Sequence, residues 1–112
     1  SFPTTLMTHW ARDRVGARLP LERLVKAQAH DTARAVGLHD RGRLAPGLRA
    51  DINLIDTSAL RLHAPQVVHD LPAGGRRLMQ RASGYVATLV AGRVTYRDGV
   101  ATGALPGRLV RS

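Results

Sequence analysis

The first part of the chain shows the spacing of apolar residues that is typical of helices. Between residues 2 and 15, apolar side chains recur at intervals of one, three and four positions, which draws one helical stripe from Leu6, Met7, Trp10, Ala11 and Val15. Pro3 suits the first turn of such a helix, because an amide there has no intrahelical partner to lose. The pattern predicts a helix over residues 2–15.

A second apolar repeat, over residues 21–28, predicts another helix after the break at residues 19–20. Asp31 follows this repeat, and aspartate is a residue type that caps helices. We therefore expect Asp31 to begin a third, short helical turn. Gly37 would close that turn, since glycine adopts the left-handed backbone conformation without strain.

From residue 38 onward, the pattern changes to turns and short strands. Residues 50–56 alternate between apolar and polar positions, as a half-buried strand does. Residues 85–91 and 94–97 are rich in β-branched and aromatic side chains and flank a glycine, which predicts a hairpin. The stretch from residue 57 to the Pro-Ala-Gly-Gly loop at 72–75 shows no regular period, and we expect a looser conformation there.

The order of these elements leaves the strands short of partners. Helices come first and short strands follow without helices between them, and a hairpin alone is marginally stable in water. We therefore expect the strands to pair with more sheet. One interpretation is an interaction domain that completes its sheet with a second copy of the chain.

Composition describes an ordinary globular protein of one-domain size. The chain has 112 residues, 44% of them hydrophobic, and it has no cysteine, which excludes a disulfide framework and thiolate metal sites. No apolar run is long enough to span a bilayer, and a signal peptide pattern is absent from the N-terminus. These features predict a cytoplasmic protein without membrane association.

A strongly basic charge raises nucleic-acid binding as an alternative function. Seventeen Lys and Arg residues against eight acidic ones give a net charge of +9. The arginines are dispersed along the chain, however, and the few aromatic residues form no motif for stacking on bases. A free-standing basic module that binds nucleic acid therefore remains the weaker hypothesis.

The sequence offers no self-contained catalytic or metal site. Its five histidines show neither HxH nor HExxH spacing, and its serines lie outside any GxSxG context. A Gly-Gly-Arg-Arg stretch at 74–77 could cradle a phosphate, but it lacks the glycine spacing of known phosphate loops. We predict no catalytic residue and no metal ligand in this chain.

Residues 19–56 nevertheless resemble the segment by which metal-dependent amidohydrolases leave their barrel. In that family, a last helix runs into Gly-Leu, then an Arg-Gly-x-Leu-x-Pro-Gly turn, then an Ala-Asp-hydrophobic strand, and residues 37–38, 41–47 and 50–52 match these in order. Within the superfamily, residues 1–14, 71–99 and 102–111 are similar to the N-acyl-D-amino-acid deacylase branch, also called D-aminoacylase. The resemblance covers essentially the whole chain.

The resemblance implies that this chain is the C-terminal segment of a longer enzyme. The expected fold class is an α+β fragment: residues 1–37 would be the last helices of a (β/α)8 barrel. Residues 38–112 would be the C-terminal strands of a small β-sandwich domain built from both ends of the protein. The missing N-terminal and barrel part of the same protein would then be the partner that the strands lack.

The resemblance also implies which functions lie outside this chain. The family's metal ligands, for zinc or another divalent metal, and its catalytic Asp lie upstream of the segment that matches Ser1, so the chain alone would have no hydrolase activity. His9 and Trp10 would border the substrate pocket, because loops and helix starts after barrel strands face the active site. Four further residues, Pro46, Gly47, Gly92 and Gly99, are expected to form structural turns.

Overall fold

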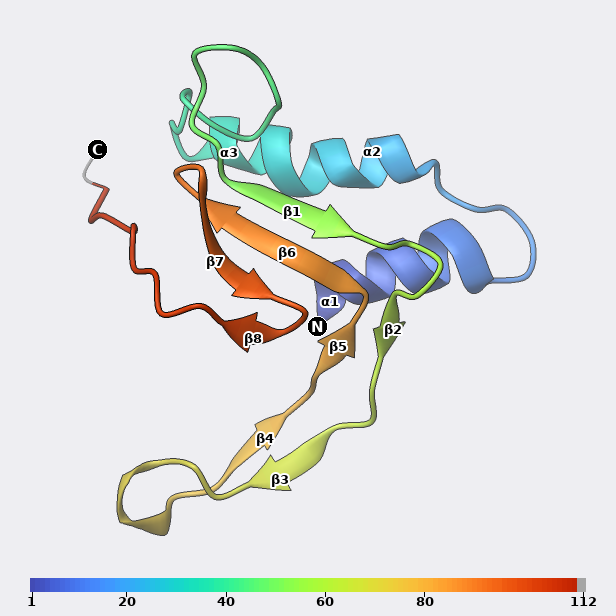
Figure 1. Cartoon of the computed structure of the whole chain (residues 1–112). Helices are drawn as coiled ribbons and strands as arrows, with labels where there is room; N and C mark the ends of the chain where they lie inside the picture. The colour runs from blue at the N-terminus through green and yellow to red at the C-terminus, as the bar shows by residue number, and fades with distance from the viewer. Residues whose placement is uncertain (111–112) are drawn as a thin grey trace.

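The first helix follows directly from the apolar stripe near the N-terminus. The computed structural model describes residues 1–110, and it begins with α1 (Phe2–Thr5), which continues into the π-helical segment η1 (Leu6–Asp13) (Figure 1). Pro3 lies in the first turn. Arg14 ends the helix because its backbone is extended, at φ −66° and ψ 146°. The predicted helix is therefore confirmed as far as Asp13.

The second helix is one continuous element rather than two. It comprises α2 (Leu21–Lys26), η2 (Ala27–Asp31) and α3 (Thr32–Ala35). The prediction that Asp31 caps a separate turn was wrong, because the Asp31 backbone is itself helical, at φ −70° and ψ −38°. Its carboxylate instead accepts a hydrogen bond from Lys26 Nζ at 2.6 Å and lies 2.9 Å from His30 Nδ1.

Gly37 ends this helix as predicted. Its φ is +78°, in the left-handed region. The amide of Gly37 donates to the carbonyl of Arg34 at 3.1 Å, and the amide of Leu38 donates to that of Ala33 at 2.8 Å. These two bonds form a Schellman motif, which satisfies carbonyls that the end of a helix leaves without partners.

The predicted hairpin lies at the centre of a four-stranded antiparallel sheet. Its strand order is β1-β6-β7-β8. The turn between β6 and β7 uses Ala91 and Gly92 at φ +50° and +77°, and the turn between β7 and β8 uses Asp98 and Gly99 at +48° and +79°. Two consecutive left-handed residues match the twist of antiparallel strands. The strands are β1 (Ile52–Ile55), β6 (Tyr85–Val90), β7 (Arg93–Arg97) and β8 (Val100–Ala101).

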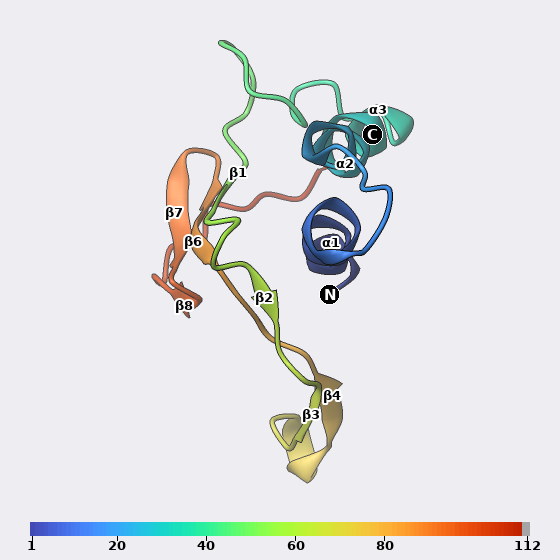
Figure 2. The same cartoon turned by 90° about the vertical axis from the view of Figure 1, so that its right-hand side faces the viewer.

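A long two-stranded arm, residues 61–83, projects from the sheet (Figures 1 and 2). We expected a looser conformation over most of its first half, and this prediction was wrong, because two strands lie there. Each arm strand is two or three residues long, too short to show a period of two in the sequence. Two antiparallel pairs build the arm: β2 (Arg61–Leu62) with β5 (Ala82–Ser83), and β3 (Gln66–Val68) with β4 (Arg77–Met79), with the short 3-10 helix η3 (Pro72–Gly74) at the tip.

The helices and the sheet meet at a small core beside the base of the arm. Leu60 is 1% exposed there. Thr4 Oγ1 of α1 lies 2.7 Å from the hydroxyl of Tyr85 at the start of β6, and Thr8 donates to the carbonyl of Thr4 at 2.9 Å. Both threonines are buried, so these bonds satisfy hydroxyl groups that would otherwise destabilise the core.

The chain exposes much more surface than a compact protein of its mass. Its accessible surface is 8483 Å², against about 6,000 Å² for a folded monomer of this size. Its radius of gyration is 16.0 Å, against about 13 Å for a compact domain. The buried apolar residues among those described are few, namely Leu24, Ala33, Leu60 and Ala87. The core is therefore small for a chain of this length.

Candidate functional site

The two predicted site residues, His9 and Trp10, form an aromatic cluster near the end of the first helix. Their ring centroids lie 5.6 Å apart at an interplanar angle of 89°, which is an edge-to-face contact. The structure adds a third member that the sequence did not indicate, since Arg14 Cζ lies 4.4 Å from the centroid of the Trp10 ring. Sequence alone does not indicate this contact, because it depends on where the helix ends. Arg14 is the first residue with an extended backbone, and its side chain lies over the Trp10 ring.

Backbone hydrogen bonds hold this cluster in place. The amide of Arg14 donates to the carbonyl of His9, five residues earlier, at 2.9 Å, as in a π-helix. The amide of Leu19 donates to the carbonyl of Trp10 at 3.0 Å, and Arg18 Nε donates to the carbonyl of Arg14 at 3.2 Å. The loop after the helix is thereby folded back onto the aromatic cluster.

Three arginines and one aspartate, Arg12, Arg14, Arg18 and Asp13, give the surroundings of the cluster a net positive charge. The Arg12 guanidinium donates hydrogen bonds to Asp13, which lowers the pKa of that carboxyl below its usual range, and the charges of His9 and Arg18 act in the same direction. An ionised Asp13 is neutralised by Arg12. Trp10 is 39% exposed, so the cluster presents an aromatic ring beside a cation. Such a surface can bind a planar or anionic group.

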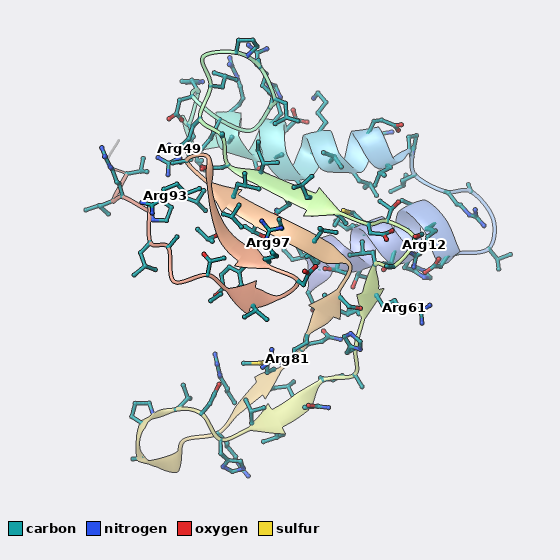
Figure 3. All side chains as sticks on the ribbon, in the orientation of Figure 1. Arg12, Arg49, Arg61, Arg81, Arg93 and Arg97 are labelled. Atoms are coloured by element: carbon teal, nitrogen blue, oxygen red, sulfur yellow. The ribbon has the colours of Figure 1, made fainter. Side chains whose placement is uncertain are left out.

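Arg12 also fastens the first helix to the loop before the arm. Its Nη2 donates to the carbonyl of Leu60 at 3.0 Å, and its Nη1 donates to that of Thr57 (Figure 3). Charged donors to backbone carbonyls make stronger hydrogen bonds than neutral ones. Arg12 therefore joins two parts of the chain that are more than forty residues apart in sequence.

A second polar cluster forms around Asp51, just before β1. Its carboxylate accepts hydrogen bonds from Arg49 Nε at 2.9 Å and from the amide of Ala91, in the β6–β7 turn, at 2.8 Å. Arg41 Nη1 lies 3.5 Å from the same carboxylate. Burial alone would raise the pKa of Asp51, but these hydrogen bonds and cations outweigh it and lower the pKa.

The turn that contains Arg41 packs closely on the second helix. Gly42 has φ +89°, and a Cβ there would lie 2.8 Å from the carbonyl oxygen of Ala29. Pro46 and Gly47 occupy a reversal that the amide of Leu48 closes on the carbonyl of Ala45 at 3.2 Å. Gly47 has φ +82°, as a type II turn requires. Gly42, Pro46 and Gly47 therefore set the path of the backbone, and they carry no reactive side chain.

Metal-ligating side chains do not converge in the part of the chain that the structure describes. Within residues 1–110, no three His, Asp or Glu side chains lie close enough to hold one ion. The arginines labelled in Figure 3 are also spread over several parts of the structure: Arg12 lies on the first helix, Arg61 and Arg81 lie on the arm, and Arg49 and Arg93 lie near the β6–β7 turn.

A model of the amidohydrolase family matches residues 1–96 of the chain. The chain belongs to the amidohydrolase family. This match includes both helices, the Asp51 cluster, the arm and all of β7 except Arg97.

One curated relative of this amidohydrolase chain is an imidazolonepropionase from Ruegeria sp. (strain TM1040). The two are 49% identical over 41 residues, which is 37% of this chain and 10% of the relative. The chain thus aligns with only a tenth of that protein's length. No solved structure shows a significant match.

Among the described residues, none of the helices combines the length and the apolar character needed to cross a membrane.

Proposed function

We propose that this chain is the C-terminal structural part of a metal-dependent amidohydrolase that hydrolyses the amide bond of N-acyl-D-amino acids. The family match over residues 1–96 carries the coarser part of this proposal. The D-aminoacylase specificity rests on the similarity of residues 1–14, 71–99 and 102–111 to that branch. The chain's contribution would be to complete the fold and not to supply reacting groups.

The proposed fold assigns each half of the chain to a different part of the enzyme. Residues 1–37 would be the last helices of a (β/α)8 barrel, and residues 38–112 would be the C-terminal strands of a small β-sandwich domain. The edge positions of β1 and β8 support this assignment, because each pairs on one side only within the described sheet. The large exposed surface supports it too, since a barrel and a second sheet would cover it.

The metal of such an enzyme would need ligands from outside this chain. The described residues do not fit zinc or another divalent ion, because they offer no group of three suitable side chains. We therefore assign no step of hydrolysis to these residues.

The assignment of His9 and Trp10 to the rim of the substrate pocket stays a prediction, and their position counts against it. In (β/α)8 barrels, the active site lies at the strand ends from which the helices start. His9 and Trp10 lie in the last turns of the first helix instead. A role of Trp10 in holding the loop of residues 14–19 agrees better with the contact of its ring with Arg14, at the start of that loop.

Substrate hydrolysis by the full enzyme tests the proposed function. We expect the purified polypeptide that contains this chain to hydrolyse N-acetyl-D-amino acids and to leave the L-enantiomers largely intact. We expect the isolated 112 residues to show no turnover with added zinc. Hydrolysis confined to a different amide, such as imidazolonepropionate, would contradict the proposed substrate class. Turnover by the isolated chain would contradict its structural role.

A further inference from the structure

The first helix is attached to the rest of the chain near each of its two ends. Near its start, Oγ1 of Thr4 lies 2.7 Å from the hydroxyl of Tyr85, the first residue of β6. Near its end, Arg12 donates to the carbonyls of Thr57 and Leu60, in the loop between β1 and β2 (Figure 3). The two attachments are about two helical turns apart. A substitution can therefore remove either attachment and leave the other in place.

The attachment at the start of the helix is buried. Thr4 is only 4% exposed, and a hydroxyl group that water does not reach is normally satisfied by a specific partner. Thr8, which is also buried, donates from its Oγ1 to the carbonyl of Thr4 at 2.9 Å. The amide of Thr5 donates to the carbonyl of Ser1 at 3.1 Å. Hydrogen bonds thus tie the first turn of the helix both to the next turn and, through Tyr85, to the sheet.

Tyr85 is held in place by the sheet. It is half-buried, and it pairs with Ile55 of β1 in the antiparallel ladder. The carbonyl of Gly84, the residue before it, accepts a hydrogen bond from the amide of Asp56 at 2.8 Å. The Tyr85 hydroxyl is therefore a fixed point, and its contact with Thr4 sets where the helix begins relative to the sheet.

The two ends of the first helix would have different surroundings in the proposed enzyme. Residues 1–37 would be barrel helices there. In a (β/α)8 barrel, each helix starts on the face that carries the active site and ends toward the opposite face. Thr4 would accordingly lie on the side of the active site, and Arg12 would lie on the remote side. The loop that leads into this helix would be one of the loops that build the active site.

We propose that Thr4 and Tyr85 are positioning residues for the hydrolysis reaction of the amidohydrolase that contains this chain. Their hydrogen bond fixes the first turn of the first helix, and with it the loop that enters this helix at the active site. This inference rests on the proposed function, because the barrel assignment places the helix start on the active-site face. Arg12 stabilises the same helix at its far end and has no influence on the reacting groups.

Steady-state kinetics of the purified full-length amidohydrolase with an N-acetyl-D-amino acid tests the inference. Tyr85→Phe removes one hydroxyl group and keeps the ring. We expect kcat to fall by about tenfold, because small displacements of the groups around a reacting bond slow the reaction. KM should stay within about twofold of the wild-type value, because the hydrogen bond adds no contact with the substrate. Thr4→Val should have the same effect.

Two further variants separate positioning from stability. Arg12→Met is the matched control, because it removes the bonds to Thr57 and Leu60 and keeps an apolar side chain of similar length. Its melting temperature should fall at least as far as that of Tyr85→Phe, since charged donors make the stronger hydrogen bonds, but its kcat should stay within about twofold of the wild-type value. Thr4→Ser keeps the hydroxyl group and should also retain kcat. All rates are measured well below the lowest melting temperature, so that every variant is folded.

Three results would overturn the positioning role. The first is a kcat within twofold of the wild-type value in both Tyr85→Phe and Thr4→Val. The second is a fall of kcat in Arg12→Met as large as that in Tyr85→Phe, because loss of stability alone would then explain both. The third is a Thr4→Ser variant as slow as Thr4→Val, because the methyl group and not the hydroxyl would then matter.

The proposed function can fail separately from this inference. A wild-type enzyme that hydrolyses a different amide contradicts the proposed substrate class. The same four variants, compared on that amide, then decide the positioning role by the same criteria. If wild-type turnover of N-acyl-D-amino acids is found and kcat is unchanged in Tyr85→Phe and Thr4→Val, the proposed function stands and the positioning role is wrong.

Discussion

Gly84 lies directly against Leu60, so that a Cβ on Gly84 would be 2.6 Å from the Cα of Leu60. This contact joins the base of the arm to the start of β6, and it has no room for a side chain. Gly84 also has φ +96°, a conformation that L-residues rarely adopt. Two independent constraints therefore require glycine at this position.

Replacing Gly84 by alanine should destabilise the protein severely. We expect a loss of about 2–4 kcal/mol in the free energy of unfolding, from backbone strain and from overpacking against Leu60. Urea denaturation of the amidohydrolase measures it. Gly103→Ala is the matched control, because Gly103 has a similar φ of +83° but nothing within 4 Å of the added Cβ. Equal losses in the two variants would show that the close contact contributes nothing.

The hydrogen bond between Thr4 and Tyr85 should couple the first helix to the sheet. Thr4→Val and Tyr85→Phe each leave one hydroxyl group without its partner, and each should cost about 1 kcal/mol of stability. The double variant should lose less than the sum of the two, because no hydroxyl then remains unpaired. Additive losses in this double-mutant cycle would contradict the coupling.

Asp51 should make stability depend on pH in the acid range. Its pKa in the folded protein is lowered from the ordinary value of 3.8. The ionised Asp51 carboxylate therefore stabilises the folded protein fully when the pH is above the ordinary pKa of 3.8. This stabilisation is lost as the pH falls through the lower pKa that Asp51 has in the folded protein. Asp51→Asn should be less stable at pH 7. The difference in unfolding free energy between wild type and variant should shrink as the pH falls below about 4. A difference that stays constant down to pH 2 would assign the effect to another group.

Trp10→Ala separates the two roles considered for the aromatic cluster. Loss of the ring removes the cation–π contact with Arg14 and part of the packing of the loop at residues 14–19, and we expect a loss of about 1 kcal/mol or more in stability. We expect KM for an N-acyl-D-amino acid to stay within about twofold of the wild-type value. A rise in KM without a loss of stability would instead place Trp10 at the substrate pocket.

The elements that the sequence predicted well are those that local residues determine. The helix end at Gly37 and the hairpin around Gly92 depend on glycines in left-handed turns, and a sequence shows such residues directly. The separate turn at Asp31 failed for a different reason. Residues 27–30 contain nothing that breaks a helix, so the backbone continued and Asp31 paired with Lys26 instead.

The arm and the polar clusters could not be predicted from local pattern. β3 and β4 have three residues each, and their pairing across residues 69–76 is a long-range property. The contact of Arg12 with Leu60 and that of Asp51 with Ala91 likewise join residues forty or more positions apart.

The two left-handed turns at residues 91–92 and 98–99 also bear on the order in which the sheet can form. They connect β6, β7 and β8 through neighbouring residues, so this three-stranded meander has a low contact order and can assemble early. β1 precedes β6 by about thirty residues and must close a long loop before it pairs. During synthesis, β1 would therefore wait until residues 85–90 are made before it can pair with β6.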